Sequence, residues 1–446
     1  MTLPSGTMQI IPDMPICQQD LPLDWYQEEF KPYAEEYLAL PDRKPETVLP
    51  WMHRYIHPAL DHFGPRLMLL AHYYMGGEIV KLVERYGGRI ADSYELALQT
   101  REHPETKIFV ESAVHFMAES IAILAAPDQE VWITNPKSGC TLEMLAKDWM
   151  VEPAYEELRG RYGDDLMVLA YMNTSGRVKA IAGRTGGAVC TSSNAEAIAR
   201  WALSEGRKIL FVPDRHLGSN VAASAGIPES ALFQWGGGDE GGRARIADLK
   251  PADLRRLDDA TMILWGSFCG VHTVFTPEHV EYWRKRGYRV LVHPECPKPV
   301  VDAADGAGST KYLWAAVTDA APGDKLAIAT EGHFCRNARE QGALRGVDVV
   351  NLADVPDPAF ASMGCGCATM SRNDPPHLVA ILDLLRKGEA PELNRVLAGD
   401  VVEETTGRRE RLAEQERTDV ALFARQALER MIAITKKAPP TSAGGA

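Results

Sequence analysis

Three stretches of the chain, NPKSGCTLEMLAKDW (135–149), ILWGSFCGVHTVFTPEHV (263–280) and GCGCATMSRNDPPHLVAILDLL (364–385), each place a cysteine at a turn between a strand and a helix. A short apolar run typical of a buried strand precedes each turn, and an amphipathic run typical of a helix follows it. Ligands of open α/β sheets gather at the carboxyl ends of the strands, so Cys140, Cys269 and Cys367 can converge on one metal centre. Three thiolates are one fewer than a closed four-cysteine site needs, which predicts an iron–sulfur cluster with one open iron, as a catalyst requires.

The chain on either side of these turns repeats the same pattern of strand, loop and helix. Apolar runs that predict strands start near Leu67, Ile108, Val131, Met167, Ala188, Ile209, Met262, Val290, Leu326 and Val347. Strands that alternate with helices are typical of parallel sheets whose faces are covered by helices. The sequence therefore predicts an α/β fold.

The three cysteines divide the predicted strands into three successive blocks. The expected α/β domains are 61–150 with Cys140, 151–285 with Cys269, and 286–390 with Cys367. We expect these domains in a pseudo-threefold arrangement, with the cluster near its axis. The blocks share no obvious sequence similarity, so this expectation depends on the pattern alone.

The two ends of the chain look different from the middle. Residues 1–60 form an N-terminal arm rich in Pro, Trp and acidic residues, which we predict to be irregular apart from one helix near Asp24–Leu38. Residues 391–446 are predicted to form C-terminal helices, the best at Ala421–Ile434, and a tail whose composition predicts disorder. Within the middle, the Gly-rich stretch 233–249 predicts a flexible surface insertion.

Composition limits the classes of function. A net charge of -13 argues against nucleic acid, whose binding depends on Lys and Arg. The chain has no apolar run of about 18 residues, which predicts no transmembrane helix, and its N-terminus lacks the pattern of a secretory signal. Eight cysteines in 446 residues are too sparse for a disulfide scaffold. These features predict a cytoplasmic enzyme with reduced thiols.

Polar residues follow many of the predicted strands. The strand ends read AHYY (71–74), ADS (91–93), AYMNTSG (170–176), CTSSNA (190–195), PDRHLGSN (213–220), CGVH (269–272), HPEC (293–296), GST (308–310) and TEGH (330–333). Ser, Thr and Asn before a helix fit the binding of phosphate or carboxylate, because helix N-termini offer free N–H groups. Each single run is explained as well by helix capping. So many runs at the same end of the sheets favour a shared polar cavity.

Histidines and one glutamate at these ends are candidates for proton transfer. His72, His272 and His293 lie there, although a lone histidine is more often structural than catalytic. Glu295 follows His293 by two residues and is the best general acid or base, since a closed pocket can raise the pKa of a carboxyl group towards working pH. Glu295 is equally compatible with a role at the start of a helix.

Spacing alone does not decide which of the cysteines are the metal ligands. Cys296 could compete as a ligand, either Cys365 or Cys367 could bind, and Cys190 and Cys335 fit buried apolar positions. Cys17 lies in the arm. The chain has no C-x-x-C, no P-loop and no convincing G-x-G-x-x-G after a strand, which weakens zinc-ribbon, simple ferredoxin and nucleotide-binding interpretations.

The ordered set of motifs resembles the quinolinate synthase family. The runs AHYY, FMAES, SGCTLEM, YMNTSGRVKA, CTSSNAEAI, FVPDRHLGSNVA, CGVH, HPEC, AD-x-x-GST, TEGH and C-x-x-M appear in the family's order over roughly residues 66–386. The resemblance implies three Rossmann-like α/β/α domains around an oxygen-sensitive [4Fe–4S] cluster. It implies condensation of iminoaspartate with dihydroxyacetone phosphate to quinolinate in NAD biosynthesis, with release of phosphate and two waters. An enzyme that supplies iminoaspartate, L-aspartate oxidase or aspartate dehydrogenase, is a further expected partner.

The resemblance also implies roles for individual residues. Cys140, Cys269 and Cys367 match the cluster ligands, with Cys367 preferred over Cys365 because Met370 completes C-x-x-M. The expected catalytic residues are Glu295, His293, His272 and Tyr74. The expected substrate-binding residues are His72, Ser93, Tyr171, Asn173, Ser192, Ser309 and Thr310.

Departures from the family pattern keep other functions open. Met75 stands where A-H-Y-Y-Q is usual, ADS replaces G-D-S, RTGGAV precedes CTSS, and Lys137 and Ser138 flank the first ligand unusually. A paralogue that makes a related pyridine or condenses another substrate is therefore an alternative. An iron–sulfur redox sensor and a zinc hydrolase are weaker ones, because a sensor needs no polar cavity and catalytic zinc prefers His-rich ligands.

Overall fold

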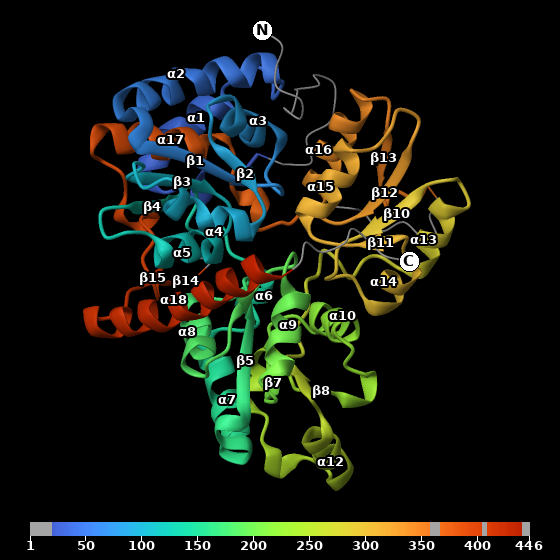
Figure 1. Ribbon diagram of the computed structural model, residues 1–446. Coiled ribbons are helices and arrows are strands. Elements are labelled where there is room, and N and C mark those ends of the chain that lie inside the picture. The colour runs from blue at the N-terminus through green and yellow to red at the C-terminus, as the bar shows by residue number, and fades with distance from the viewer. Residues whose placement is uncertain (1–19, 357–365, 404–407, 439–446) are drawn as a thin grey trace.

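Three lobes, each built around its own parallel sheet, make up the body of the molecule (Figure 1). The computed structural model describes residues 20–356, 366–403 and 408–438. Within these ranges, no helix combines the length and the apolar character that crossing a bilayer requires. The predicted α/β fold with parallel sheets is confirmed.

The first lobe has a four-stranded sheet in the order β2-β1-β3-β4. Its strands are β1 (Leu67–His72), β2 (Arg89–Ala91), β3 (Ile108–Ser112) and β4 (Glu130–Ile133). Its helices are α3 (Gly77–Arg85), α4 (Ser93–Glu102), α5 (His115–Leu124) and the short α6 (Thr141–Met144). All strand pairs are parallel, so the carboxyl ends of the strands share one edge.

The second lobe has a five-stranded parallel sheet in the order β6-β5-β7-β9-β8. Its strands are β5 (Leu166–Tyr171), β6 (Val189–Cys190), β7 (Lys208–Val212), β8 (Leu232–Gln234) and β9 (Met262–Leu264). Its helices are α7 (Asp148–Tyr162), α8 (Gly176–Arg184), α9 (Ala195–Ser204), α10 (Arg215–Ala225), α11 (Gly238–Arg243) and α12 (Pro251–Asp259). Every residue of β5 is buried, as expected for a central parallel strand.

The third lobe repeats the four-stranded order as β11-β10-β12-β13. Its strands are β10 (Arg289–Val292), β11 (Gly306–Ala307), β12 (Lys325–Ala329) and β13 (Asp348–Asn351). Its helices are α13 (Pro277–Arg284), α14 (Lys298–Ala303), α15 (Thr310–Thr318) and α16 (Gly332–Ala343). The ADS and GST runs, expected to be strand ends, follow the short strands β2 and β11, although neither strand carries an apolar run of its own. Strand β8 was not predicted, because most of it lies in the stretch interpreted as a flexible insertion.

The N-terminal arm is more regular than the sequence suggested. The expected helix near 24–38 is two 3₁₀ turns, Leu23–Trp25 and Glu28–Phe30, followed by α1 (Lys31–Leu38). A long helix, α2 (Pro45–Phe63), was missed; it contains Pro50 and Pro58, which ordinarily argue against a helix interior.

The chain returns to the first lobe after the third sheet. Helix α17 (Pro375–Lys387) packs against α1 and α2 rather than on the third sheet. This return is not part of the predicted blocks, whose boundaries stay a prediction. A two-stranded antiparallel ribbon follows, β14 (Val401–Val402) with β15 (Arg409–Glu410).

The last helix, α18 (Glu414–Lys437), contains the predicted 421–434 segment and lies across the first two lobes (Figure 1). It packs mainly against α8, and also against α5 and α9. At its crossing with α8, a Cβ atom on Gly183 would lie 2.0 Å from the carbonyl oxygen of Phe423. Only glycine allows this approach. The predicted tail lies mostly at 439–446, outside the described residues.

The interpretation of 233–249 as a flexible insertion was wrong. The stretch supplies part of β8 and all of α11, and the Trp235 ring is almost fully buried. Its glycines allow close packing: a Cβ on Gly241 would lie 2.7 Å from the ring of Trp265. The glycines of this stretch therefore allow close packing and are no sign of a flexible segment.

Candidate active site

Residues from all three lobes line one cavity. The predicted site residues in its wall are His72, Tyr74, Ser93, Cys140, Tyr171, Asn173, Ser192, Cys269, His272, His293, Glu295, Thr310 and Cys367. Ser309 is not in the wall. Most of these residues directly follow strands, because parallel strands present their carboxyl ends to the same side.

The three candidate ligand cysteines lie on three separate loops. Cys140 precedes α6, Cys269 lies in the turn after β9, and Cys367 precedes a 3₁₀ turn at Met370–Arg372. Ser138 connects two of the loops, since its hydroxyl donates a hydrogen bond to the carbonyl oxygen of Thr369 at 2.7 Å. Ser138, one of the unusual residues before the first cysteine, therefore links the Cys140 loop to the Cys367 loop.

The thiols influence one another. Burial raises the pKa of Cys140, and the closeness of Cys367 raises it further. Burial also raises the pKa of Cys269, with added contributions from Glu295, Cys140 and Cys367. Three partly buried thiols whose charges would repel one another need a cationic centre before all can ionise, and metal binding would then release their protons.

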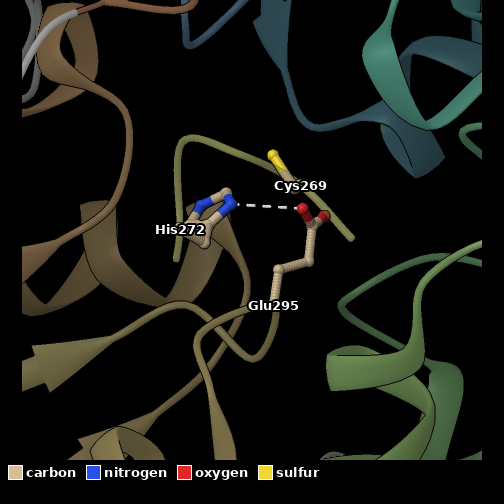
Figure 2. A group of neighbouring side chains, drawn as sticks. All are labelled: Cys269, His272 and Glu295. Carbon is tan, nitrogen blue, oxygen red and sulfur yellow. Dashed lines mark ion pairs between the residues drawn. The ribbon is translucent and has the colours of Figure 1, made fainter. Parts of the chain in front are cut away.

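Glu295 is close enough to Cys269 and His272 for all three to hold one ion. Within the described ranges they are the one set of three metal-type residues whose donor atoms all lie within 4.8 Å of one another (Figure 2). The sulfurs of Cys140, Cys269 and Cys367 do not form such a set. Ligands on one tetrahedral zinc ion lie about 3.8 Å apart, because each zinc–sulfur bond is about 2.3 Å long. Three thiols more widely spaced around a cavity fit a multi-iron cluster better than a single ion.

Glu295 stands at the centre of a polar network. One carboxylate oxygen, Oε2, lies 3.1 Å from Nδ1 of His272, and the other, Oε1, accepts a hydrogen bond from the hydroxyl of Tyr171 at 2.5 Å. The rings of His272 and His293 stack with centroids 4.6 Å apart. Nε2 of His272 lies 3.2 Å from the hydroxyl of Thr330.

This network reverses the pKa shift that was expected for Glu295. Burial alone would raise its pKa, but the contact with His272, the nearby His293 and the hydrogen bond from Tyr171 together lower it. The expectation of a raised pKa was wrong because it considered the closed pocket and not the partners within it. Glu295 is therefore a carboxylate at neutral pH, ready to accept a proton.

Two other histidines of the wall, His72 and His293, are neutral at neutral pH. Burial lowers the pKa of His72 to about 3, and burial together with the nearby His272 lowers that of His293 to about 3. Tyr74 remains protonated, since burial raises its pKa well above the ordinary value. Its hydroxyl lies 2.8 Å from that of Thr330, so Tyr74 connects the first lobe to the third.

Apart from Asp92 and Glu331, the other polar residues of the wall are uncharged donors at helix starts and loops. Ser93 and Thr310 are the first residues of α4 and α15. Asn173 lies beside the first cysteine, with Nδ2 4.0 Å from Sγ of Cys140. The wall as described contains neither Lys nor Arg. Ser309 instead caps α15, accepting the N–H of Tyr312 at 3.4 Å.

Several wall residues carried no predicted role. Asp92 and Glu331 belong to the ADS and TEGH runs and were considered only as parts of polar strand ends. Phe116 and Met117 come from FMAES and supply an apolar side of the cavity. The positions of Asp92 and Glu331 at strand ends were the available signal. The sequence does not distinguish a carboxylate that only caps a helix from one that also faces a cavity.

The other cysteines lie away from the cavity. Cys190, Cys296 and Cys335 are buried in three different apolar clusters. Cys296, considered as a competing ligand, directs its thiol towards the carbonyl oxygen of Ala329 at 3.8 Å. Cys17 and Cys365 lie outside the described residues.

Comparisons with known proteins agree with one another. The family model described as quinolinate synthetase A protein matches residues 61–406. A quinolinate synthase of Corynebacterium glutamicum is 33% identical over 436 residues, covering 97% of this chain and 98% of that protein. Those of Acidobacterium capsulatum and Streptomyces coelicolor are 36% and 34% identical, covering 90% and 91% of this chain and 95% and 94% of their own lengths. The match to the first relative includes nearly all of the N-terminal arm and the C-terminal helices.

Proposed function

The chain belongs to the quinolinate synthase family and is an enzyme of that type, and from this premise we propose that it condenses iminoaspartate with dihydroxyacetone phosphate to quinolinate, releasing phosphate and two waters. The observation that carries the proposal is the joint presence of three cysteines and the Glu295–His272 pair in the wall of one cavity. The metal-type ligands and the proton-transfer groups thereby face the same volume.

A [4Fe–4S] cluster would be held by Cys140, Cys269 and Cys367, near a pseudo-threefold axis of the three lobes. The donor set supports this proposal, because three soft thiols from three loops face one cavity and their spacing exceeds that of a single tetrahedral ion. When bound, such a cluster supplies an open iron that acts as a Lewis acid and eases the loss of water.

Glu295 would act as the general base. Its low pKa keeps it ionised, and the hydrogen bond from Tyr171 together with His272 holds the carboxylate in one orientation. A proton taken by Glu295 can pass to His272, which is in direct contact with it. His293 would support the pair by stacking on His272.

The remaining predicted residues would bind and orient the substrates. Ser93 and Thr310 at helix N-termini, with Asn173 and Ser192, offer neutral donors to carboxylate and phosphate groups. His72 and Tyr74 would add a neutral imidazole and a phenol. A wall without Lys or Arg suits this role, because anions that are bound by neutral donors can be released after the reaction.

The decisive experiment is a product assay under strict anaerobiosis. The protein is incubated with enzymatically generated iminoaspartate and dihydroxyacetone phosphate, and the products are identified by mass. We expect quinolinate, from a brown protein with about four irons per chain and labile sulfide. A different pyridine would assign the chain to a paralogue. Colourless protein with one zinc and no sulfide would overturn the cluster and favour an ion on Cys269, His272 and Glu295.

A further inference from the structure

Two fully buried carboxylates each contact the backbone of a candidate ligand cysteine. The N–H of Cys269 donates a hydrogen bond to Oδ2 of Asp214 at 3.0 Å. The N–H of Cys367 donates to Oε1 of Glu331 at 2.8 Å. Neither carboxylate received a role from the sequence, and neither is needed for the proton transfers proposed above.

Each carboxylate also caps a helix, and its two oxygens accept hydrogen bonds from different partners. Oδ1 of Asp214 accepts the N–H groups of His216 and Leu217 at the start of α10, at 2.8 Å each. Oε2 of Glu331 accepts the N–H of Phe334 at the start of α16, at 2.9 Å. Capping therefore occupies one oxygen in each residue, while the other oxygen faces the N–H of the cysteine; Oε1 of Glu331 also lies 3.0 Å from Nδ1 of His333.

The two carboxylates occupy equivalent positions in two lobes. Asp214 lies two residues after the end of β7, and Glu331 lies two residues after the end of β12. Each of these strands is third in its sheet order. The equivalent residue after β3 in the first lobe is Val114, which cannot accept a hydrogen bond through its side chain.

The Cys140 loop is held by a different contact. There the carbonyl oxygen of Ser138 accepts the N–H of His115, the first residue of α5, at 2.9 Å. The helix start after the third strand therefore contacts the cysteine loop in every lobe, through a carboxylate in two of them and through backbone in one.

Gly366 gives independent support on the Cys367 side. A Cβ atom at this position would lie 2.6 Å from Nδ1 of His333 and 2.9 Å from Oε1 of Glu331. The chain just before Cys367 thus runs directly over the Glu331 carboxylate, and any larger residue would push it away.

We propose that Asp214 and Glu331 are positioning residues that fix the loops of Cys269 and Cys367 in the geometry that a cluster needs. This inference rests on the proposed function. An oriented loop reduces the freedom that each cysteine loses on binding iron, and it opposes departure of the cysteine once the cluster is assembled.

The test uses the variants D214N and E331Q. The amide oxygen of Asn or Gln can still cap the helix, but the amide nitrogen then faces the cysteine N–H, so that two donors meet. A third variant, G366A, keeps both carboxylates and forces the Cys367 loop apart from the side chains of Glu331 and His333. The control is S175A, because Ser175 caps α8 through the N–H of Val178 and has no hydrogen bond to a cysteine among the described residues.

The readout is the anaerobic rate at which the assembled cluster loses iron to a chelator, measured beside the thermal midpoint of the metal-free protein. We expect D214N, E331Q and G366A to lose iron about 10–100-fold faster than wild type, and S175A to lose it at the wild-type rate. If all four variants release iron at the wild-type rate, the carboxylates only cap helices and the inference is overturned.

The outcomes separate the inference from the function on which it rests. Wild-type protein that assembles no iron–sulfide cluster overturns both. Wild-type protein that makes quinolinate, with variants that keep iron like S175A, overturns the inference alone. If D214N does not fold, E331Q and G366A test the same device in the third lobe.

Discussion

The hydroxyl of Tyr171 donates a hydrogen bond to Oε1 of Glu295 at 2.5 Å, and this contact joins the second lobe to the third. Tyr171 ends β5, whereas Glu295 lies three residues after β10. His272, in the turn region after β9, contacts the other carboxylate oxygen. The proposed base is therefore oriented by residues of a neighbouring lobe, and its chemistry depends on how the two lobes meet.

Replacing Glu295 with Gln should abolish most of the turnover while the protein keeps its iron. A general base contributes about 10²–10⁴-fold to a rate, and E295Q removes the base without changing the size of the side chain. The quinolinate assay measures the loss, and iron and sulfide analysis shows that the cluster remains. Turnover within a few-fold of wild type would exclude Glu295 as the base, and it would also be the result expected of a redox sensor.

Replacing Tyr171 with Phe should have a smaller effect of the same kind. Y171F removes one of the groups that lower the pKa of Glu295, so that pKa should rise and less carboxylate should be present at mildly acidic pH. The acidic limb of the kcat profile should shift to higher pH, with little loss of rate at pH 8. An unchanged acidic limb together with a uniformly low rate would assign Tyr171 to substrate binding instead.

The sequence predicted those parts of the fold that depend on local pattern. The run 166–171 is apolar throughout, and the structure makes it a central buried strand. Helix α2 was missed although Val48, Trp51, Met52, Ile56 and Ala59 follow a helical period, because the arm was judged by its composition, which is rich in Pro, Trp and acidic residues. In that case tertiary packing of one apolar face decided the structure.

What the sequence could not predict depends on contacts between distant residues. The motif order placed Glu295 in the site, but its low pKa requires Tyr171 and His272 from another lobe. Asp214 and Glu331 resemble ordinary helix caps in sequence, and their second contact appears only once Cys269 and Cys367 are brought beside them. The return of α17 to the first lobe is set by its packing on α1 and α2, which no local pattern encodes.

A buried ion pair between Lys81 and Glu340 holds the first lobe against the third, and its two ends should differ in importance. Nζ of Lys81 lies 2.5 Å from Oε2 of Glu340, and Nε of Arg336 lies 3.5 Å from Oε1 of the same carboxylate. E340Q leaves the buried Lys81 without its carboxylate, whereas K81M leaves Glu340 beside Arg336. We expect E340Q to cost about 3–5 kcal/mol and K81M less.

Thermal unfolding of the metal-free variants compares the two costs. The double variant K81M/E340Q is the control, and it should be more stable than E340Q alone because no uncompensated lysine remains. Equal losses in both single variants would show that Arg336 gives Glu340 no support.

Glu111 should make the protein less stable as pH rises. Its side chain is fully buried, neither carboxylate oxygen has a hydrogen-bond partner among the described residues, and burial raises its pKa well above 4.5. The folded state therefore favours the protonated acid. The protein therefore keeps its full stability below the pKa that Glu111 has in the unfolded chain. It loses stability as pH rises from that value towards the higher pKa that Glu111 has in the folded protein.

The variant E111L tests this sign. It should raise the thermal midpoint of the metal-free protein at pH 8, by the equivalent of about 1–3 kcal/mol, and raise it less at pH 5. E111Q, which cannot ionise, should show the same weakened dependence on pH. A larger gain at pH 5 than at pH 8 would mean that Glu111 is charged in the folded protein.

Two glycine-to-alanine changes in helix interiors should have opposite effects. At Gly183 the new Cβ would lie 2.0 Å from the carbonyl oxygen of Phe423, so G183A must push α18 away from α8. At Gly160, exposed in α7, a Cβ meets nothing within 4 Å, so G160A should stabilise the protein by about 0.5–1 kcal/mol.

We expect G183A to lower the thermal midpoint by several degrees and to expose α18 to limited proteolysis, while G160A raises the midpoint and leaves the cleavage pattern unchanged. Because helix propensity favours alanine at both sites, a stabilising G183A would show that the crossing of α8 and α18 is not as close in solution as the Gly183–Phe423 contact requires.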